Sequence, residues 1–262
     1  GDVDGTLQMS IARAHLSQIF GRMVDNQYLA KYSEEFWNKM MAKQPVVKKS
    51  YTAAQGIAVE EDFEETSSIE DLFSKNWAFR SGNVTFPEET LNGTKNRYLL
   101  VEDTGATEQD SARCAFDKIY GDGSIECSMR IDRELPYEEK KNDMSYTFFT
   151  VGSMDRTLLS MNALDNGSDK VTLAFQNNKS GSVTYNSFAT VDRNEWFRFR
   201  MDFSHDQNGT LHMKCYLNGK LQPAVEDALL ISDVPYIDVF EICTSTARCS
   251  RIGLDNFKVT VK

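Results

Sequence analysis

The chain has 262 residues, of which 40% are hydrophobic, and its formal net charge at pH 7 is −10. This length suits one large domain with a smaller additional segment. The acidic balance argues against a nucleic-acid-binding protein, because phosphate contacts need clustered Lys and Arg. No apolar run is long enough to cross a membrane as a helix, so we predict no membrane insertion. An acidic, soluble chain of this kind fits an extracellular or cell-surface location.

The five cysteines do not form a metal-binding pattern. No CxxC pair occurs, and the chain has only three histidines, so a structural zinc site is not expected. Cys114, Cys127 and Cys215 alternate in phase with apolar neighbours, which predicts that they are small buried core residues. Cys243 and Cys249 flank a predicted turn, and a disulfide between them is one possibility. Nothing in the sequence indicates an organic cofactor.

Residues 1–50 have the periodicity of two helices. Apolar side chains recur at helical spacing from Leu7 to Met23 and again from Tyr28 to Met41, and Pro45 ends the second run. Two helices alone bury too little surface to fold independently. We therefore expect a helical hairpin that packs on the following domain or forms the tail of an upstream module.

The opening GDVDGTL raises three alternatives. A phosphatase nucleophile loop would need a buried strand before Asp2, and only Gly1 precedes it. A calcium loop would need a glycine and an acidic residue where Leu7 and Arg13 stand. The stretch DGTLQMSIARAHLSQIFGRM, residues 4–23, resembles the end of an S-layer homology repeat. An ordinary amphipathic helix is the alternative to that resemblance.

From about residue 55 the pattern changes to short alternating runs separated by turn signals. Turns rich in Gly and Asn recur every eight to twelve residues, which is typical of antiparallel strands. About eleven to thirteen strands are too many for an immunoglobulin domain and suit a two-sheet jelly roll. We therefore predict a mostly β fold over 51–262, an antiparallel sandwich preceded by the helical hairpin. The runs are RYLLVED, SARCAFD, SIECSMRID, SYTFFTVG, TLLSMNA, KVTLAFQ, SVTYNSF, WFRFRMDFS, TLHMKCYLNG, YIDVFEIC and LDNFKVTVK.

Three segments resemble the concanavalin A-like/laminin-G-like jelly-roll superfamily. They are AVEEDFEE near the start, NEWFRFRMDFSHDQNGTLHMKCYLNGK, and IGLDNFKVTVK at the end, so the resemblance covers about residues 56–262. It implies that the last strand lies beside the first. It also implies a structural calcium site built from an acidic first strand and an aspartate on the last, with Glu64 and Asp255 as ligands. The superfamily holds lectins, glycosidases, lyases and adhesion modules, so the resemblance indicates a fold rather than one function.

The motifs of the enzymes on this fold are missing. Family 16 glycosidases need paired carboxylates on one strand, but EEDFEE belongs to the predicted first strand, and Glu241 in VFEIC has no partner. The alginate-lyase motifs RxExR, QxH and YxKxGxYxQ do not occur. We therefore assign no catalytic residues.

The segments 196–203 and 210–217 predict a functional surface. Because side chains alternate along a strand, Arg198, Arg200, His212, Lys214 and Tyr216 should share one outer face. A tight Asn208-Gly209 turn is expected to join the two strands. One reading is a glycan platform, where tyrosine stacks on a sugar ring while arginine and histidine bind hydroxyls or a uronate carboxylate. The other is a solvated face with ordinary cross-strand ion pairs.

These observations predict a non-catalytic carbohydrate-binding or adhesion module of a larger secreted or cell-surface protein. Its expected partner is a glycan or polysaccharide, acidic ones included. Two alternatives stay open. The first is a polysaccharide lyase or glycoside hydrolase with His212 as base and Tyr216 as acid. The second is a structural spacer between domains.

Overall fold

The computed structural model describes residues 55–80, 83–102, 110–133, 144–153, 156–165, 168–177, 183–230, 236–244 and 250–262. All of them fall within one compact unit, Thr52–Lys262. The predicted helical hairpin and the segment that resembles an S-layer homology repeat lie outside these residues. Among the helices within them, none is long and apolar enough to span a membrane.

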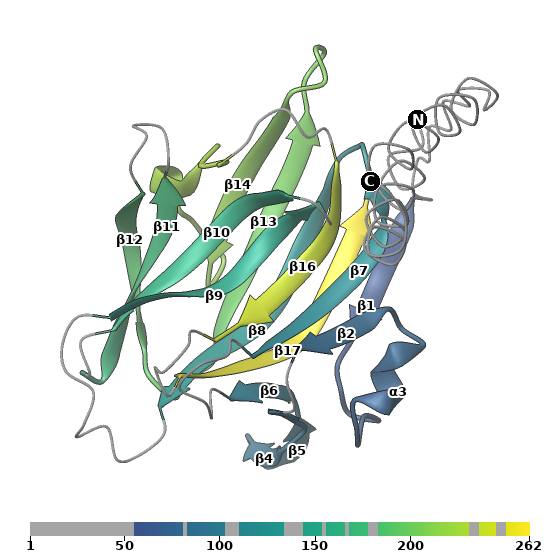
Figure 1. Cartoon of the computed structure of the whole chain (residues 1–262), viewed down its shortest axis with the longest axis vertical. Helices are drawn as coiled ribbons and strands as arrows, with labels where there is room; N and C mark the ends of the chain where they lie inside the picture. The colour runs from purple at the N-terminus through teal and green to yellow at the C-terminus, as the bar shows by residue number, and fades with distance from the viewer. Residues whose placement is uncertain are drawn as a thin grey trace, which may run out of the picture. The chain divides into compact units, whose positions relative to one another are not determined.

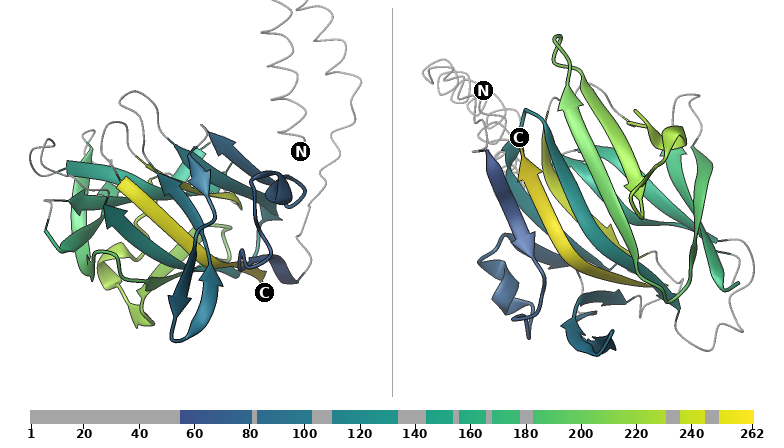
Figure 2. Two further views of the ribbon diagram at one scale, coloured as in Figure 1. Left: turned by 90° about the horizontal axis from the view of Figure 1, so that it is seen from below. Right: turned by 180° about the vertical axis from the view of Figure 1, so that it is seen from behind.

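Two antiparallel sheets pack face to face (Figure 1), and the view from behind brings the eight-stranded sheet forward (Figure 2, right). Sheet A has the strand order β15 (Lys220–Leu221), β14 (Leu211–Leu217), β13 (Phe197–His205), β8 (Gly123–Arg133), β17 (Ser250–Val261), β6 (Leu99–Glu102) and β3 (Val84–Thr85), with β1 (Gly56–Glu61) also paired to β17. Sheet B has the order β12 (Thr184–Asp192), β11 (Lys170–Asn177), β10 (Arg156–Asp165), β9 (Met144–Ser153), β16 (Ile237–Cys243), β7 (Ser111–Ile119) and β2 (Trp77–Arg80). The remaining elements are the hairpin β4 (Glu88–Leu91)–β5 (Thr94–Arg97), the short helix α3 (Glu70–Phe73) and a 3-10 turn, Pro223–Val225.

The predicted mostly β antiparallel sandwich is confirmed. Each of the eleven predicted runs forms a strand or the greater part of one, and the last strand, β17, pairs with the first, β1. The described residues contain more strands than expected because several are only two to four residues long, such as β3 and β15. Segments this short carry no readable alternation of apolar and polar residues.

A chain of aromatic rings crosses between the two sheets. Phe199 of sheet A lies 4.8 Å from Phe149 of sheet B, and Phe149 stacks on Phe240 at 5.6 Å. Phe240 then contacts Phe257 of sheet A at 4.9 Å, and Phe257 meets Trp77 of sheet B at 5.5 Å. All five side chains are buried. Rings at these separations add attraction beyond the burial of their surface, so this chain is the centre of the core.

The connection between β13 and β14 is the expected tight turn through Asn208 and Gly209. β13 ends at His205 and β14 begins at Leu211, so five residues join the strands. The Asp206 carboxylate accepts hydrogen bonds from the backbone amides of Asn208 (2.8 Å) and Thr210 (2.9 Å). The Asp206 amide also donates to the Thr210 carbonyl at 3.0 Å, and the Gly209 amide donates to the Asp206 carbonyl at 3.0 Å, with Gly209 at a φ of 79°. The predicted tight turn at Asn208-Gly209 is therefore confirmed, and the Asp206 side chain caps its downstream amides.

The prediction that three cysteines belong to the core is confirmed. Cys114, Cys127 and Cys215 are buried, and burial raises the pKa of the Cys114 thiol to about 12 and raises those of the other two as well. The Cys243 thiol donates to the Thr147 carbonyl oxygen at 3.5 Å. Cys249 lies outside the described residues, so the Cys243–Cys249 disulfide stays a prediction.

We predict that Phe240→Ala lowers the free energy of unfolding by about 3–5 kcal/mol, because it removes a fully buried ring that packs against two others. Chemical denaturation followed by fluorescence measures the change. Tyr185→Ala, at an exposed position on β12, is the control and should change stability by about 0.5 kcal/mol or less. Equal effects of the two substitutions would contradict the central place of the aromatic chain.

Candidate functional site

The structure places all five predicted ligand-binding residues on the outer face of sheet A. Along β13 the side chains of Phe197, Phe199, Met201 and Phe203 are buried, and in β14 Leu211, Met213, Cys215 and Leu217 are buried. The intervening side chains therefore point away from sheet B. Arg200 lies opposite Tyr216 in the register of the two strands. The sequence pattern thus brings Arg198, Arg200, His212, Lys214 and Tyr216 to one surface.

Carboxylates accompany these cations. Arg200 forms a close pair with Asp202 (2.7 Å) along its own strand. His212 Nδ1 lies 3.0 Å from Asp227 Oδ2, and Lys214 Nζ lies 3.7 Å from Glu226 Oε1. These pairs are ordinary for a solvated sheet face. The presence of cations alone therefore does not make the surface a site for anions.

Arg198 is the cation best able to reach a ligand. Its side chain is 79% exposed, and its pair with Glu126 is long, at 3.9 Å. Its backbone amide donates to Asn218 Oδ1 at 2.8 Å, which fixes the backbone where the guanidinium departs. The Tyr216 ring is less available, since the Arg200 guanidinium lies 5.8 Å from its centroid. An exposed cation on a hydrogen-bonded backbone is suited to hydrogen bonding with an incoming polar group.

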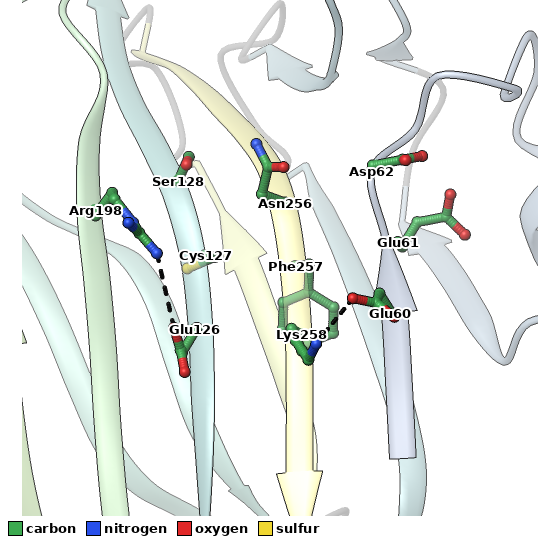
Figure 3. A pocket seen from close by; sticks show the side chains of 10 residues that line it. All are labelled: Glu60, Glu61, Asp62, Glu126, Cys127, Ser128, Arg198, Asn256, Phe257 and Lys258. Atoms are coloured by element: carbon green, nitrogen blue, oxygen red, sulfur yellow. Dashed lines mark hydrogen bonds and ion pairs between the residues drawn. The ribbon is translucent and has the colours of Figure 1, made fainter. Parts of the chain in front are cut away.

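Arg198 borders a depression of about 280 Å³ in the outer face, which we call the β17 hollow (Figure 3). It runs across four neighbouring strands, from β13 over β8 and β17 to the end of β1. Its lining residues are Glu60, Glu61, Asp62, Glu126, Cys127, Ser128, Arg198, Asn256, Phe257 and Lys258.

A bulge in β17 shapes the floor of this hollow. Asp255 pairs with Ser128 and Lys258 pairs with Glu126, so β17 carries one extra residue between these two positions. Asn256, with a φ of 48°, occupies the left-handed region that asparagine tolerates, and its side chain is exposed. The bulge returns Phe257 to the core and leaves a polar residue on the floor of the hollow.

His212 and Lys214 line a second depression of about 360 Å³, the β14 hollow. It also contains the side chains of Asp202 and Ser204 from β13 and Asp227 from beyond β15. Hydrogen bonding to Asp227, with its charge, raises the pKa of His212, and Asp206 contributes further. Arg200 and Tyr216 line neither hollow and lie in the row between them.

A buried cluster around Arg130, which we call the Arg130 clasp, fastens the β4–β5 hairpin over the outer face beside the β17 hollow. The Arg130 guanidinium lies between the rings of Tyr98 and Trp196, 4.7 and 4.9 Å from their centroids. It pairs with Glu89 of the hairpin at 2.5 Å and with Asp132 at 2.9 Å. Trp196 Nε1 donates to the same Glu89 carboxylate at 2.6 Å. Arg130 points outward from the sheet yet is only 11% exposed, so the hairpin covers this end of the face.

The hairpin is also tied to the loop that follows β1. The Arg97 amide donates to Glu64 Oε1 at 3.3 Å, and the Arg97 guanidinium donates to the carbonyl of Thr66 at 3.0 Å. The clasp and these contacts hold β4–β5 over the Arg130 end of the outer face. Gly253 allows the arrangement, because a Cβ there would lie 3.2 Å from the Trp196 ring.

Sequence reasoning missed most of the residues that line the β17 hollow. Along β8, Glu126, Ser128 and Arg130 alternate with apolar residues, so their outward orientation was readable. The position of β8 between β13 and β17 could not be read from the sequence, since these strands are far apart along the chain. The lining residues of the hollow come together only through this strand order.

The predicted calcium ligands lie close enough to interact, and each has another hydrogen-bond partner. Glu64 accepts from the Arg97 amide, and Asp255 Oδ1 accepts from the Asn256 amide at 2.6 Å. Over the described ranges, no group of three or more His, Cys, Asp or Glu side chains is arranged to hold a metal ion. The calcium site at Glu64 and Asp255 therefore stays a prediction.

Asp255 is buried, and its environment favours the neutral acid. Burial raises the pKa of the Asp255 carboxyl to about 6. Hydrogen bonding from the Asn256 amide and the Asn96 side chain opposes this rise, whereas the charges of Glu64 and Asp62 add to it. The region beside the end of β1 therefore has an excess of negative charge.

No protein-family model matches the sequence, and a sequence search of curated proteins found no match. Solved structures do resemble the fold. The carbohydrate esterase vb_24B_21 from the Shiga toxin-encoding bacteriophage phi24B is 14% identical, with a TM-score of 0.54 over 79% of this chain and 100% of that one. The alginate lyase Aly36B, solved in complex with alginate trisaccharide, is 10% identical, with a TM-score of 0.55 over 80% of this chain and 100% of that one. At these identities the likeness shows the fold alone.

If calcium binds at Glu64 and Asp255, removing it should lower the melting temperature, because an ion bound only by the folded state adds stability by mass action. Differential scanning calorimetry with EDTA and with added calcium measures the shift. Asp255→Asn should abolish the response. Identical melting curves in EDTA and in calcium would rule this site out.

We predict that Asp255→Asn, in EDTA, raises stability above pH 7 and leaves it unchanged near pH 4. The folded-state pKa of about 6 lies above the ordinary value of 3.8, so the folded chain holds this proton where the unfolded chain has lost it. The stabilisation is present below about pH 4 and is lost as the pH rises to about 6, at a cost on the order of 3 kcal/mol. The amide does not ionise and avoids that cost. Unfolding curves across this pH range measure the difference, and Asp192→Asn, on the exposed β12, is the control.

Proposed function

We propose that this chain is a non-catalytic carbohydrate-binding module of a secreted or cell-surface protein, and that it binds a hydroxyl-rich glycan on the outer face of sheet A. The observation that carries the proposal is the β17 hollow, an open depression in which charged donors and acceptors stand side by side. Arg198 stands beside Glu126, and Lys258 lies 2.9 Å from Glu60 (Figure 3).

The chemistry of these pairs matches that of sugars. A sugar hydroxyl is both a donor and an acceptor, so two neighbouring hydroxyls can bond a cation and a carboxylate at once. Ser128 and Asn256 add neutral groups that can donate and accept. Because the hollow is shallow and few contacts are desolvated, we expect dissociation constants of about micromolar to millimolar.

The structural comparisons support a carbohydrate partner without naming it. One similar structure is titled a carbohydrate esterase and another an alginate lyase with bound trisaccharide. A uronate ligand would need cations with unsatisfied charge, whereas Arg200, His212 and Lys214 already face carboxylates. The pairing therefore favours recognition of hydroxyls.

Catalysis is the second candidate, since the β14 hollow places the pair His212–Asp227 beside Ser204. A general base must be neutral to accept a proton. The pKa of His212 is raised by hydrogen bonding to Asp227 and by Asp206, so the imidazole keeps its proton to higher pH than usual. This environment is unfavourable for a base and favours the binding proposal.

The test is calorimetric titration of the wild type and the Arg198→Ala/Tyr216→Ala variant against alginate, glucuronan and neutral β-glucans at low and physiological salt. The double variant should lose about tenfold or more in affinity and keep its melting temperature, because both positions face solvent. The matched control is Lys170→Ala/Tyr185→Ala, which removes an exposed cation and an exposed tyrosine from sheet B.

Equal affinities of the double variant and the wild type would remove the outer face as the binding site. No binding to any polysaccharide would favour the spacer. Release of unsaturated or reducing sugar ends by the wild type, lost in His212→Gln, would assign an enzyme instead.

A further inference from the structure

The charge of the β17 hollow indicates which glycans it can accept. Its lining has four carboxylates and two cations, an excess of two negative charges. The carboxylates are those of Glu60, Glu61, Asp62 and Glu126, and the cations are those of Arg198 and Lys258.

The ion pairs show where the excess charge lies. Glu60 pairs with Lys258 at 2.9 Å, and the buried Glu61 pairs with Lys75 at 2.5 Å. Asp62 instead accepts a hydrogen bond from the Glu64 backbone amide at 3.2 Å. Among the described residues, no lysine or arginine lies within ion-pair distance of the Asp62 carboxylate. The negative charge is thus uncompensated at the β1 end of the hollow.

The two ends of the β17 hollow should prefer ligand groups of opposite charge. Figure 3 shows Arg198 on β13 at one side, and Glu60 on β1 with Asp62 just after it at the other. Adjacent strands lie about 4.8 Å apart, so the four strands β13, β8, β17 and β1 span about 14 Å, room for about three sugar rings. One ring would then lie near the exposed Arg198 guanidinium, and another near the Asp62 carboxylate.

The β14 hollow also has a negative net charge. Asp122, Asp202, Glu226 and Asp227 face Lys214, Lys262 and His212 there, so even a protonated imidazole leaves one negative charge in excess. A glycan that extends from one hollow to the other meets an excess of negative charge in both hollows, with Arg200 and Tyr216 between them. The formal charge of the whole chain, −10, adds a weak repulsion of the same kind.

We propose that the β17 hollow, taken as the binding site proposed above, selects neutral and amine-bearing glycans over uronates, with a sugar ammonium or hydroxyl donor placed at the Asp62 carboxylate. An ammonium gains a charge-assisted hydrogen bond there, and a uronate carboxylate at the same position is repelled. Each unit of ligand charge within several ångströms should change the affinity about threefold to tenfold at low salt. Salt should suppress the difference, because the hollow is open to solvent.

Four linear β-1,4-linked tetrasaccharides of one length test the proposal. Cellotetraose is the neutral reference; the glucosamine tetramer has an amine at C2, the N-acetylglucosamine tetramer has an uncharged amide there, and the glucuronic acid tetramer has a carboxylate at C6. Calorimetric titrations are run in EDTA at a pH where the amine is protonated. We expect the glucosamine tetramer to bind tightest and the glucuronic acid tetramer weakest, with at least about tenfold between them at low salt and convergence at high salt.

Asp62→Asn removes the charge and keeps an acceptor for the Glu64 amide. It should reduce the preference for the glucosamine tetramer over cellotetraose about threefold or more, with an unchanged melting temperature. The control, Asp192→Asn, removes an exposed carboxylate from sheet B and should leave the preference intact.

The outcomes separate this inference from the proposed function. Tightest binding of the glucuronic acid tetramer, or a preference for amines that survives Asp62→Asn, would overturn the selectivity while leaving a glycan-binding module. The selectivity also fails if none of the four tetramers binds and an acidic polysaccharide does. If no tetramer and no polysaccharide binds, the proposed function itself is wrong.

Discussion

The packing of sheet A against sheet B through one chain of aromatic rings is the constraint on which the surface depends. Phe199, Phe149, Phe240 and Phe257 occupy the space between the sheets, so every second residue of β13 must point inward, and the bulge at Asn256 turns Phe257 of β17 inward. A shift of one residue in either strand would bring charged side chains into that space, and burying an unpaired charge is very costly. The outer face is therefore defined by what the inner face must bury.

That constraint explains which features could be predicted from the sequence. Alternation along β13 and β14 was sufficient to place Arg198, Arg200, His212, Lys214 and Tyr216 on one face, because the side-chain period of a strand depends only on local geometry. The eleven main strands were readable for the same reason. Apart from β6, the strands of two to four residues were not, since segments this short contain too little pattern.

The hollows could not be predicted, because their residues meet only through long-range strand order. Glu126 and Lys258 are neighbours since β8 pairs with β17, and Asp62 joins them because β1 pairs with the far side of β17. The bulge at Asn256 is a departure from regular strand pairing that could not be predicted from the sequence. The Arg130 clasp joins β8, the hairpin and Trp196 in the same way. Nor does the sequence tell which acid each cation faces, although the acids decide the net charge of the surface.

The buried thiols have a practical consequence. Cys114, Cys127 and Cys215 lie in the sandwich interior, and burial keeps them protonated well above neutral pH. A thiol reacts with alkylating reagents as its thiolate, so these residues stay unreactive while the two sheets remain closed. Cys114 lies on β7 of sheet B, whereas Cys127 and Cys215 lie on β8 and β14 of sheet A. The alkylation rate of each cysteine therefore measures how often its own part of the sandwich opens. Equal rates would indicate that the sandwich opens as one unit, and different rates that one sheet opens before the other.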